Sequence, residues 1–161
     1  MSTGDAAADH DVVFWVGDLN YRINGNSRAV RYLLRSRLHE VLHANDQLQL
    51  QQKKGRVFQG FQEGNIHFPP TFKFTAGTSQ YSEQRVPSWT DRILWKVRVP
   101  QPWEGDVMAP SVAQTYYTSV PEVTSSDHKP VVAGFEVALA AAEVACVKAE
   151  QRSIRNRCTI M

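Results

Sequence analysis

The sequence contains little that could cross-link the chain or hold it in a bilayer. Its 161 residues include two cysteines, Cys146 and Cys158, which form no C-x-x-C spacing, so neither a disulfide framework nor a zinc site is predicted. No stretch reaches the roughly 20 apolar residues of a membrane span, and the first residues lack the apolar core of a signal peptide. We therefore expect a cytoplasmic protein that is neither secreted nor membrane-spanning.

The sequence also lacks a strong excess of charge of one sign. Lys and Arg number 18 and Asp and Glu 16, giving a net charge of +2, so electrostatics alone does not indicate a nucleic-acid partner. Hydrophobic residues make up 42% of the chain, and a chain of this length can bury roughly 68–70% of its surface. The composition predicts one globular domain, or part of one.

The hydrophobic pattern predicts strands with helices between them. Residues 12–16 form a continuous apolar run, typical of a strand buried on both faces, and it ends at Gly17-Asp18. Apolar residues at helical spacing predict a helix over 27–42 with Ser27 as its cap, and a shorter helix over 46–54 that ends at Gly55.

The second half of the chain is expected to be mainly β-structure. Residues 57–75 contain Pro69-Pro70 and predict an irregular loop around a short strand at 71–75. Further strands are predicted over 92–99, 113–120 and 131–139, and residues 140–158 favour a helix. The fold class is α/β, or α+β, with several antiparallel strands. Two tryptophans, Trp89 and Trp95, are expected in the core. Four arginines are expected on a solvated helix face: Arg28, Arg31, Arg35 and Arg37.

Four loop segments at the predicted strand ends collect Asp, Asn, His, Arg and Lys side chains: residues 17–22, 72–74, 85–92 and 126–130. A carboxylate beside an amide can orient and deprotonate water, an Asp–His pair can stabilise charge, and Lys or Arg can hold phosphate oxygens. Together these groups favour hydrolysis of a phosphate. Taken singly, Gly17-Asp18 is also an ordinary turn pair, and Ser126-Asp127-His128 could be a cap with an exposed histidine.

Two of these segments form long motifs. Phe14–Arg22 has the form F-W-x-G-D-x-N-x-R, and Arg85–Leu94 has the form R-x-P-[SA]-W-[CT]-D-R-[IV]-L. With residues 46–48, 60–64, 68–74 and 126–131 in the same order, the sequence resembles the inositol polyphosphate 5-phosphatase family over about residues 9–137.

The resemblance implies a fold and a site. The fold would be half of an endonuclease/exonuclease/phosphatase-type β-sandwich flanked by helices, with Mg²⁺ as cofactor. Asp18 would activate the attacking water, Asn20 would hold that water or a phosphate oxygen, and His128 would contact the scissile phosphate. Asp91 would orient His128, and Asp127 would lie near the metal or in its outer shell.

The same resemblance implies that Arg22, Lys73 and Arg85 bind the substrate. Two positions depart from the family: Glu83 stands where a Lys is usual, and Phe72 where a Tyr is usual. A carboxylate beside a phosphate repels it, and the lost hydroxyl removes a donor. We therefore expect a changed affinity or preference for 4,5-bisphosphates.

Length is a larger departure. The family's upstream half supplies an Asn, a metal-binding Glu and another His that have no counterpart in this sequence, which resembles the C-terminal half of the catalytic domain. The sequence is accordingly divided into a disordered lead (1–10), the catalytic part (11–139) and a basic tail (140–161). We expect weak Mg²⁺ binding and no turnover by residues 1–161 alone.

The last four residues, Cys158-Thr159-Ile160-Met161, fit a prenylation box with a residue that favours farnesyl. Four basic residues precede it: Lys148, Arg152, Arg155 and Arg157. Farnesylation of Cys158 would place the protein on the cytosolic face of membranes; the alternative is a chance ending.

The sequence is therefore consistent with three functions. The first is a Mg²⁺-dependent phosphatase that removes the 5-phosphate of phosphoinositides or soluble inositol polyphosphates. The second is a non-catalytic remnant that binds phosphoinositides or a partner protein. The third, a nuclease of the same superfold, is disfavoured because residues 72–74 and 85–89 point to the phosphatase branch; nucleic acid is not an expected partner.

Overall fold

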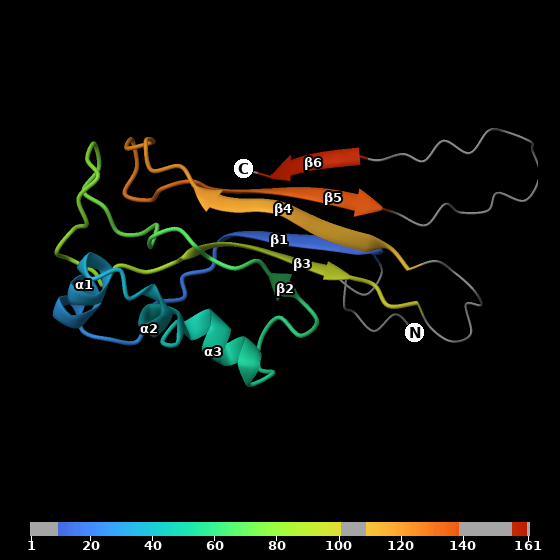
Figure 1. Cartoon of the computed structure of the whole chain (residues 1–161), viewed down its shortest axis with the longest axis horizontal. Coiled ribbons are helices and arrows are strands. Elements are labelled where there is room, and N and C mark those ends of the chain that lie inside the picture. Colours follow the sequence, from blue (N-terminus) through green and yellow to red (C-terminus); the bar gives the residue numbers. More distant parts are fainter. Residues whose placement is uncertain (1–9, 101–108, 139–155, 161) are drawn as a thin grey trace, which may run out of the picture.

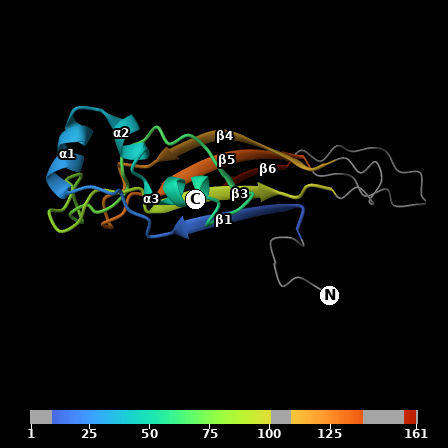
Figure 2. The same ribbon diagram turned by 90° about the horizontal axis from the view of Figure 1, so that it is seen from below.

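The structure, a computed structural model, describes residues 10–100 and 109–138 and the backbone of 156–160. Its strands form two three-stranded sheets with antiparallel pairing. The first has the order β1 (Val12–Asp18), β3 (Asp91–Val97), β2 (Gln62–Glu63), and the second β4 (Ser111–Ser119), β5 (Val131–Ala138), β6 (Asn156–Ile160). Figures 1 and 2 show the two sheets as adjacent layers. The predicted α/β or α+β fold with several antiparallel strands is confirmed.

Aromatic side chains fill the space between the sheets. The Phe135 ring of β5 lies 4.8 Å from the Phe14 ring of β1 and 5.2 Å from the Trp95 ring of β3, between ring centroids. Trp89 and Trp95 are both buried, as predicted. Burial of such large rings contributes strongly to stability, so this layer holds the two sheets together.

Strand β1 forms where the apolar run predicts it, but it is not buried on both faces. In the described part of the chain β1 pairs with β3 alone, so it is an edge strand. Trp15 is 50% exposed and Val16 44% exposed. The run length identified the strand correctly, whereas its position in the sheet depended on which partners lie beside it.

The helix expected over 27–42 is two helices, α1 (Ser27–Arg35) and α2 (His39–His43). The helix breaks before α2 because Arg37 adopts a positive φ of 56°, which an α-helix cannot contain. The cap of α1 is Asn26 rather than Ser27, and its side chain accepts a hydrogen bond from the Ala29 amide.

The shorter helix matches its prediction closely. It is α3 (Gln47–Lys53), and the Asp46 carboxylate caps it by accepting a hydrogen bond from the Gln49 amide. Gly55 follows the helix with a φ of 64°, as expected of a terminating glycine. In Figures 1 and 2, α1 and α2 lie beyond the end of the first sheet at which β1 ends.

The predicted strands over 92–99, 113–120 and 131–139 correspond to β3, β4 and β5. The strand expected at 71–75 is reduced to isolated bridges at Phe72 and Phe74. The disordered lead and most of the helix predicted past residue 140 lie outside the described residues. Where that helix reaches 156–158, the prediction is wrong, because the backbone pairs with β5 as strand β6; ladder hydrogen bonds to an open sheet edge outweigh a weak local helix preference.

Within the described ranges, no helix is long and apolar enough to cross a membrane.

Candidate active site

Three segments that are distant in sequence meet at one end of the sandwich. Asp18 ends β1 and Asp91 begins β3, and the two residues are direct partners in the antiparallel register. Direct partners of an antiparallel pair project from the same face. His128 precedes β5, whose first residues lie at the same end in Figure 1. The sequence motifs therefore converge in space.

Asp91 and His128 form a bonded pair. The Nδ1 atom of His128 lies 3.0 Å and 3.1 Å from the two carboxylate oxygens of Asp91; because a carboxylate only accepts, Nδ1 carries the hydrogen. The hydroxyls of Thr71 and Thr90 also donate to Asp91 Oδ2, at 2.8 Å and 2.9 Å. Four contacts thus fix the carboxylate, and the imidazole is oriented with Nε2 available to a ligand.

Asp18 and Asn20 form a second bonded pair on the loop after β1. The Asn20 backbone N–H and side-chain amide donate to the Asp18 carboxylate, at 2.9 Å and 3.2 Å. Asn20 has a φ of 58°, a conformation that Asn tolerates better than most residues. Arg22 donates to the Asn20 amide oxygen at 2.7 Å. The amide is therefore held from both sides, and both Asp18 and Asn20 are exposed.

Phe72 joins the two pairs. The Arg22 guanidinium lies 4.4 Å above the centre of the Phe72 ring, an attractive cation–π contact. The His128 ring also contacts Phe72, and the centroids of these two rings are 4.5 Å apart. The Nη1 atom of Arg22 is buried and has no hydrogen-bond partner in the described part of the chain. An unpaired buried guanidinium N–H is costly, so this donor favours an anionic ligand.

The other cations predicted to bind substrate lie in different settings. Lys73 lies 3.5 Å from a carboxylate oxygen of Asp127, which places Asp127 beside a lysine rather than in a cluster of acidic groups. Arg85 is exposed. Glu83 is 89% exposed and lies 3.7 Å from Arg31. Its carboxylate is therefore paired with α1 in this structure.

Arg31 is the one helix arginine whose prediction was wrong. Its side chain is largely buried and contacts the 81–83 segment, whereas Arg28, Arg35 and Arg37 are exposed. Spacing along a helix cannot reveal that a distant loop covers one of its faces.

Sequence reasoning also missed a buried ion network directly behind the site. Arg92 is 1% exposed and binds the Glu63 carboxylate at 2.6 Å and 2.7 Å and the Asp46 carboxylate at 2.9 Å and 3.0 Å. The Tyr117 hydroxyl donates to Glu63 at 2.9 Å. Burial would lower the pKa of Arg92, but Glu63 and Asp46 raise it above its ordinary value. Burial, then the charge of Glu63, raises the pKa of Tyr117.

The Arg92 network connects four elements. Asp46 caps α3, Glu63 lies in β2, Arg92 in β3 and Tyr117 in β4. Since Arg92 follows Asp91 in β3, the network also fixes the backbone that carries the Asp91–His128 pair. The signal in the sequence that could have indicated it is Arg92 directly before the apolar run Ile93-Leu94-Trp95, because a charge next to core residues needs a partner when it is buried.

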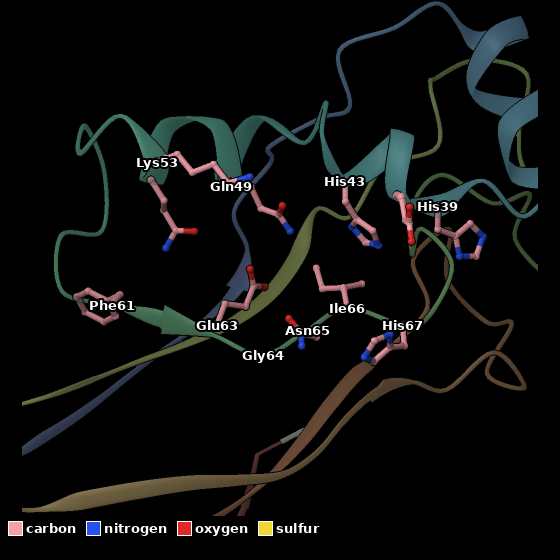
Figure 3. A pocket seen from close by; sticks show the side chains of 12 residues that line it. His39, His43, Gln49, Lys53, Phe61, Glu63, Gly64, Asn65, Ile66 and His67 are labelled. Carbon is pink, nitrogen blue, oxygen red and sulfur yellow. The ribbon is translucent and has the colours of Figure 1, made fainter.

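A separate cavity of about 720 Å³ lies between α2, α3 and the segment 61–67 (Figure 3). Three histidines line it, His39, His43 and His67. The His43 ring stacks on Trp89 with centroids 4.3 Å apart, and its Nδ1 atom has no partner in the described segments. Burial lowers the pKa of His43 below the ordinary 6.5. In the described residues, no group of three or more His, Cys, Asp or Glu is placed to hold a metal ion.

The oxygen atoms at the Asp18 end of the site could bind a hard cation such as Mg²⁺ only together with further oxygen ligands from water or substrate. All three groups already accept hydrogen bonds: the Asp18 carboxylate from Asn20, the Asn20 oxygen from Arg22, and the Asp91 carboxylate from Thr71. Of the two carboxylates, that of Asp18 is exposed. Mg²⁺ commonly binds through one or two carboxylates and completes its shell with water and substrate oxygens. The donor chemistry therefore fits a cation held mainly by water and a bound phosphate.

Comparison with known proteins agrees with this arrangement. Residues 1–134 match the Endonuclease/Exonuclease/phosphatase family 2, and the chain belongs to this family. It is 44% identical over 135 residues to rat phosphatidylinositol 4,5-bisphosphate 5-phosphatase A, covering 79% of this chain and 14% of the relative. It is 39% identical over 127 residues to Arabidopsis thaliana type IV inositol polyphosphate 5-phosphatase 11, covering 76% and 36%. The predicted resemblance to inositol polyphosphate 5-phosphatases is confirmed.

Solved structures show the same fold. The inositol polyphosphate 5-phosphatase domain of a synaptojanin, crystallised with inositol (1,4)-bisphosphate and calcium, superposes with a TM-score of 0.69 at 37% identity, covering 82% of this chain and 36% of that chain. A Cimex nitrophorin in its ferrous NO complex gives a TM-score of 0.69 at 34% identity, covering 80% and 42%. The chain thus spans less than half the length of each of these relatives, and proteins of different function share its fold.

Proposed function

We propose that this chain carries the water-activating and phosphate-binding part of a phosphatase that removes the 5-phosphate of phosphoinositides or inositol polyphosphates. The observation that carries the proposal is the continuous series of contacts from Asp18 through Asn20, Arg22 and Phe72 to the His128–Asp91 pair. Such preorganised groups suit phosphoryl transfer, which depends on positioning and charge stabilisation more than on covalent catalysis.

In the proposed reaction, Asp18 accepts a proton from water while the water oxygen attacks phosphorus. Asn20, fixed between Asp18 and Arg22, orients that water or a phosphate oxygen. His128, fixed by Asp91, stabilises the charge that develops on the phosphate. The bond between phosphorus and the ring oxygen breaks, and the leaving oxygen takes a proton from solvent.

We propose Mg²⁺ as the cofactor, held mainly by water and the bound phosphate at the Asp18 end of the site, with Asp127 in its outer shell. A bound Mg²⁺ would neutralise negative charge on the phosphate oxygens. The relative crystallised with calcium supports a divalent cation in this fold. Arg22, Lys73 and Arg85 would bind the substrate's phosphates, supported by the unpaired Nη1 atom of Arg22.

The proposal is tested by grafting residues 11–138 in place of the matching segment of the rat relative. Phosphate release from phosphatidylinositol 4,5-bisphosphate with Mg²⁺ should be retained, and plasmid DNA should not be cut. In the graft, His128→Ala should lower kcat by about 10²–10⁴-fold. Turnover by His128→Ala at the unmutated rate would refute the assignment. DNA cleavage would favour the nuclease, and lipid binding without phosphate release would favour a non-catalytic binding protein.

Farnesylation of Cys158 stays a prediction, since that side chain lies outside the described part of the structure. It would attach the protein reversibly to the cytosolic face of membranes. Cys158→Ser should move a fluorescently tagged chain from membranes to the cytosol. If the unmutated chain incorporates no labelled isoprenoid, the prediction is wrong.

A further inference from the structure

The loop formed by residues 75–85 lies directly against the segment that carries Lys73. The Ser82 amide donates to the Lys73 carbonyl at 2.8 Å, and the Thr75 amide donates to the Gln80 carbonyl at 2.8 Å. The Tyr81 ring stacks on Phe74 with centroids 4.3 Å apart. The 75–85 loop therefore supports Lys73 from one side and ends at Arg85.

Arg31 of α1 holds this loop by its backbone. The guanidinium donates to the carbonyls of Tyr81, at 3.4 Å, and Ser82, while its Nε donates to the Ser27 hydroxyl at 3.0 Å. Glu83 lies 3.7 Å away. Because the planar guanidinium presents several N–H groups in fixed directions, it can bridge a helix and two successive carbonyls, which a lysine cannot do with the same geometry.

Lys129 holds the same loop at a second point, the Thr78 carbonyl. Its Nζ atom donates to the Thr78 carbonyl at 3.2 Å and the Val123 carbonyl at 2.9 Å, and it lies 4.8 Å above the Phe74 ring. Lys129 is 3% exposed and follows His128 directly. No carboxylate is paired with it among the described ion pairs. Its ammonium group instead bridges the Thr78 carbonyl of the loop and the Val123 carbonyl, which lies outside the loop.

We propose that Arg31 and Lys129 are positioning residues that hold the 75–85 loop so that Lys73 and Arg85 meet the substrate together. This inference rests on the proposed function, because it assigns the loop to substrate binding. Charge-assisted hydrogen bonds are stronger than neutral ones. Because both cations bind main-chain carbonyls, they restrict the backbone of the loop directly and do not depend on which side chains the loop carries. Neither residue touches the Asp18–Asn20 or Asp91–His128 pair through its side chain, so their effect is on substrate binding.

The test compares Arg31→Gln with Arg28→Gln in the full chain. Arg28 lies on the same helix and is exposed, so its variant removes the same charge without removing the contacts to the loop. Backbone amide hydrogen exchange should become at least about tenfold faster over 75–85 in Arg31→Gln, with exchange in β3 unchanged, and neither should change in Arg28→Gln. Arg31→Lys, which keeps the charge and part of the hydrogen bonding, should fall between them and covers the case in which Arg31→Gln does not fold.

Titration with inositol 1,4-bisphosphate measures the consequence for recognition. We expect the dissociation constant to rise about tenfold in Arg31→Gln and to stay unchanged in Arg28→Gln. The reason is that a loosened loop must be ordered when the ligand binds, which costs free energy of binding. Unchanged loop exchange, or a loosened loop with unmutated affinity, would overturn the inference. If the unmutated chain binds no inositol 1,4-bisphosphate, the proposed function fails, and the role of the 75–85 loop in substrate binding fails with it. The exchange data decide separately whether Arg31 holds the loop.

Discussion

Removing Arg92 should destabilise the fold more than removing any surface charge. Its guanidinium satisfies the Glu63 and Asp46 carboxylates, and the side chains of Arg92 and Asp46 are fully buried. Arg92→Leu would leave those acids without a cationic partner. Breaking a buried ion pair by deleting one partner costs about 3–5 kcal/mol, a large part of the roughly 5–15 kcal/mol that stabilises a typical domain.

Urea unfolding followed by tryptophan fluorescence measures this cost, since Trp89 and Trp95 are buried and become exposed on unfolding. With a slope of about 1–3 kcal/mol per molar urea, a loss of about 3–5 kcal/mol should lower the midpoint by about 1–5 M. The double variant Arg92→Leu/Glu63→Leu should cost less than the sum of the single variants, because the second substitution removes a carboxylate that has already lost its partner.

The matched control is the exposed ion pair of Arg98 with Asp11, at 2.9 Å. Asp11→Asn should cost less than about 1 kcal/mol, because solvent screens an exposed pair. A cost below about 1 kcal/mol for Arg92→Leu, or strictly additive effects in the double variant, would refute the reasoning that the network stabilises the fold.

Three further outcomes are expected. Burial lowers the pKa of His43 below 6.5, so the unfolded chain binds more protons than the folded chain as pH falls below about 7. The free energy of unfolding should therefore decline toward pH 5. His43→Phe should flatten that decline when unfolding is measured by urea titration at each pH. Because Val16 is 44% exposed on β1, which lies at the edge of its sheet in the described part of the chain, we expect the chain to self-associate through this edge. Val16→Lys should then lower the average mass measured by sedimentation, and an unchanged mass would contradict this expectation. Glu83→Gln should leave the thermal midpoint unchanged, because the carboxylate is 89% exposed and 3.7 Å from Arg31; a clear drop would mean that the pair stabilises the fold.

Local features of the sequence determined the elements that form. Residues 91–97 and 131–138 carry β-forming apolar residues, and α3 is bounded by Asp46 and Gly55, so both kinds of element could be predicted from neighbours in the chain. The family resemblance carried by the motifs implied that Asp91 orients His128, and the structure places Asp91 Oδ2 3.0 Å from His128 Nδ1. These features depend on short-range preferences or on patterns that the sequence displays directly.

Tertiary structure decided which faces are covered and which charges meet. The sequence could not show that β1 lies at an edge, that Arg31 is covered by the 81–83 segment, or that Arg92 contacts two carboxylates from other elements. Burial and ion pairing depend on which residues approach through space, and a contact such as Arg92 to Asp46 joins residues 46 positions apart. Propensity along the chain carries no information about such a pairing, because its free energy arises only when packing excludes water from both charges.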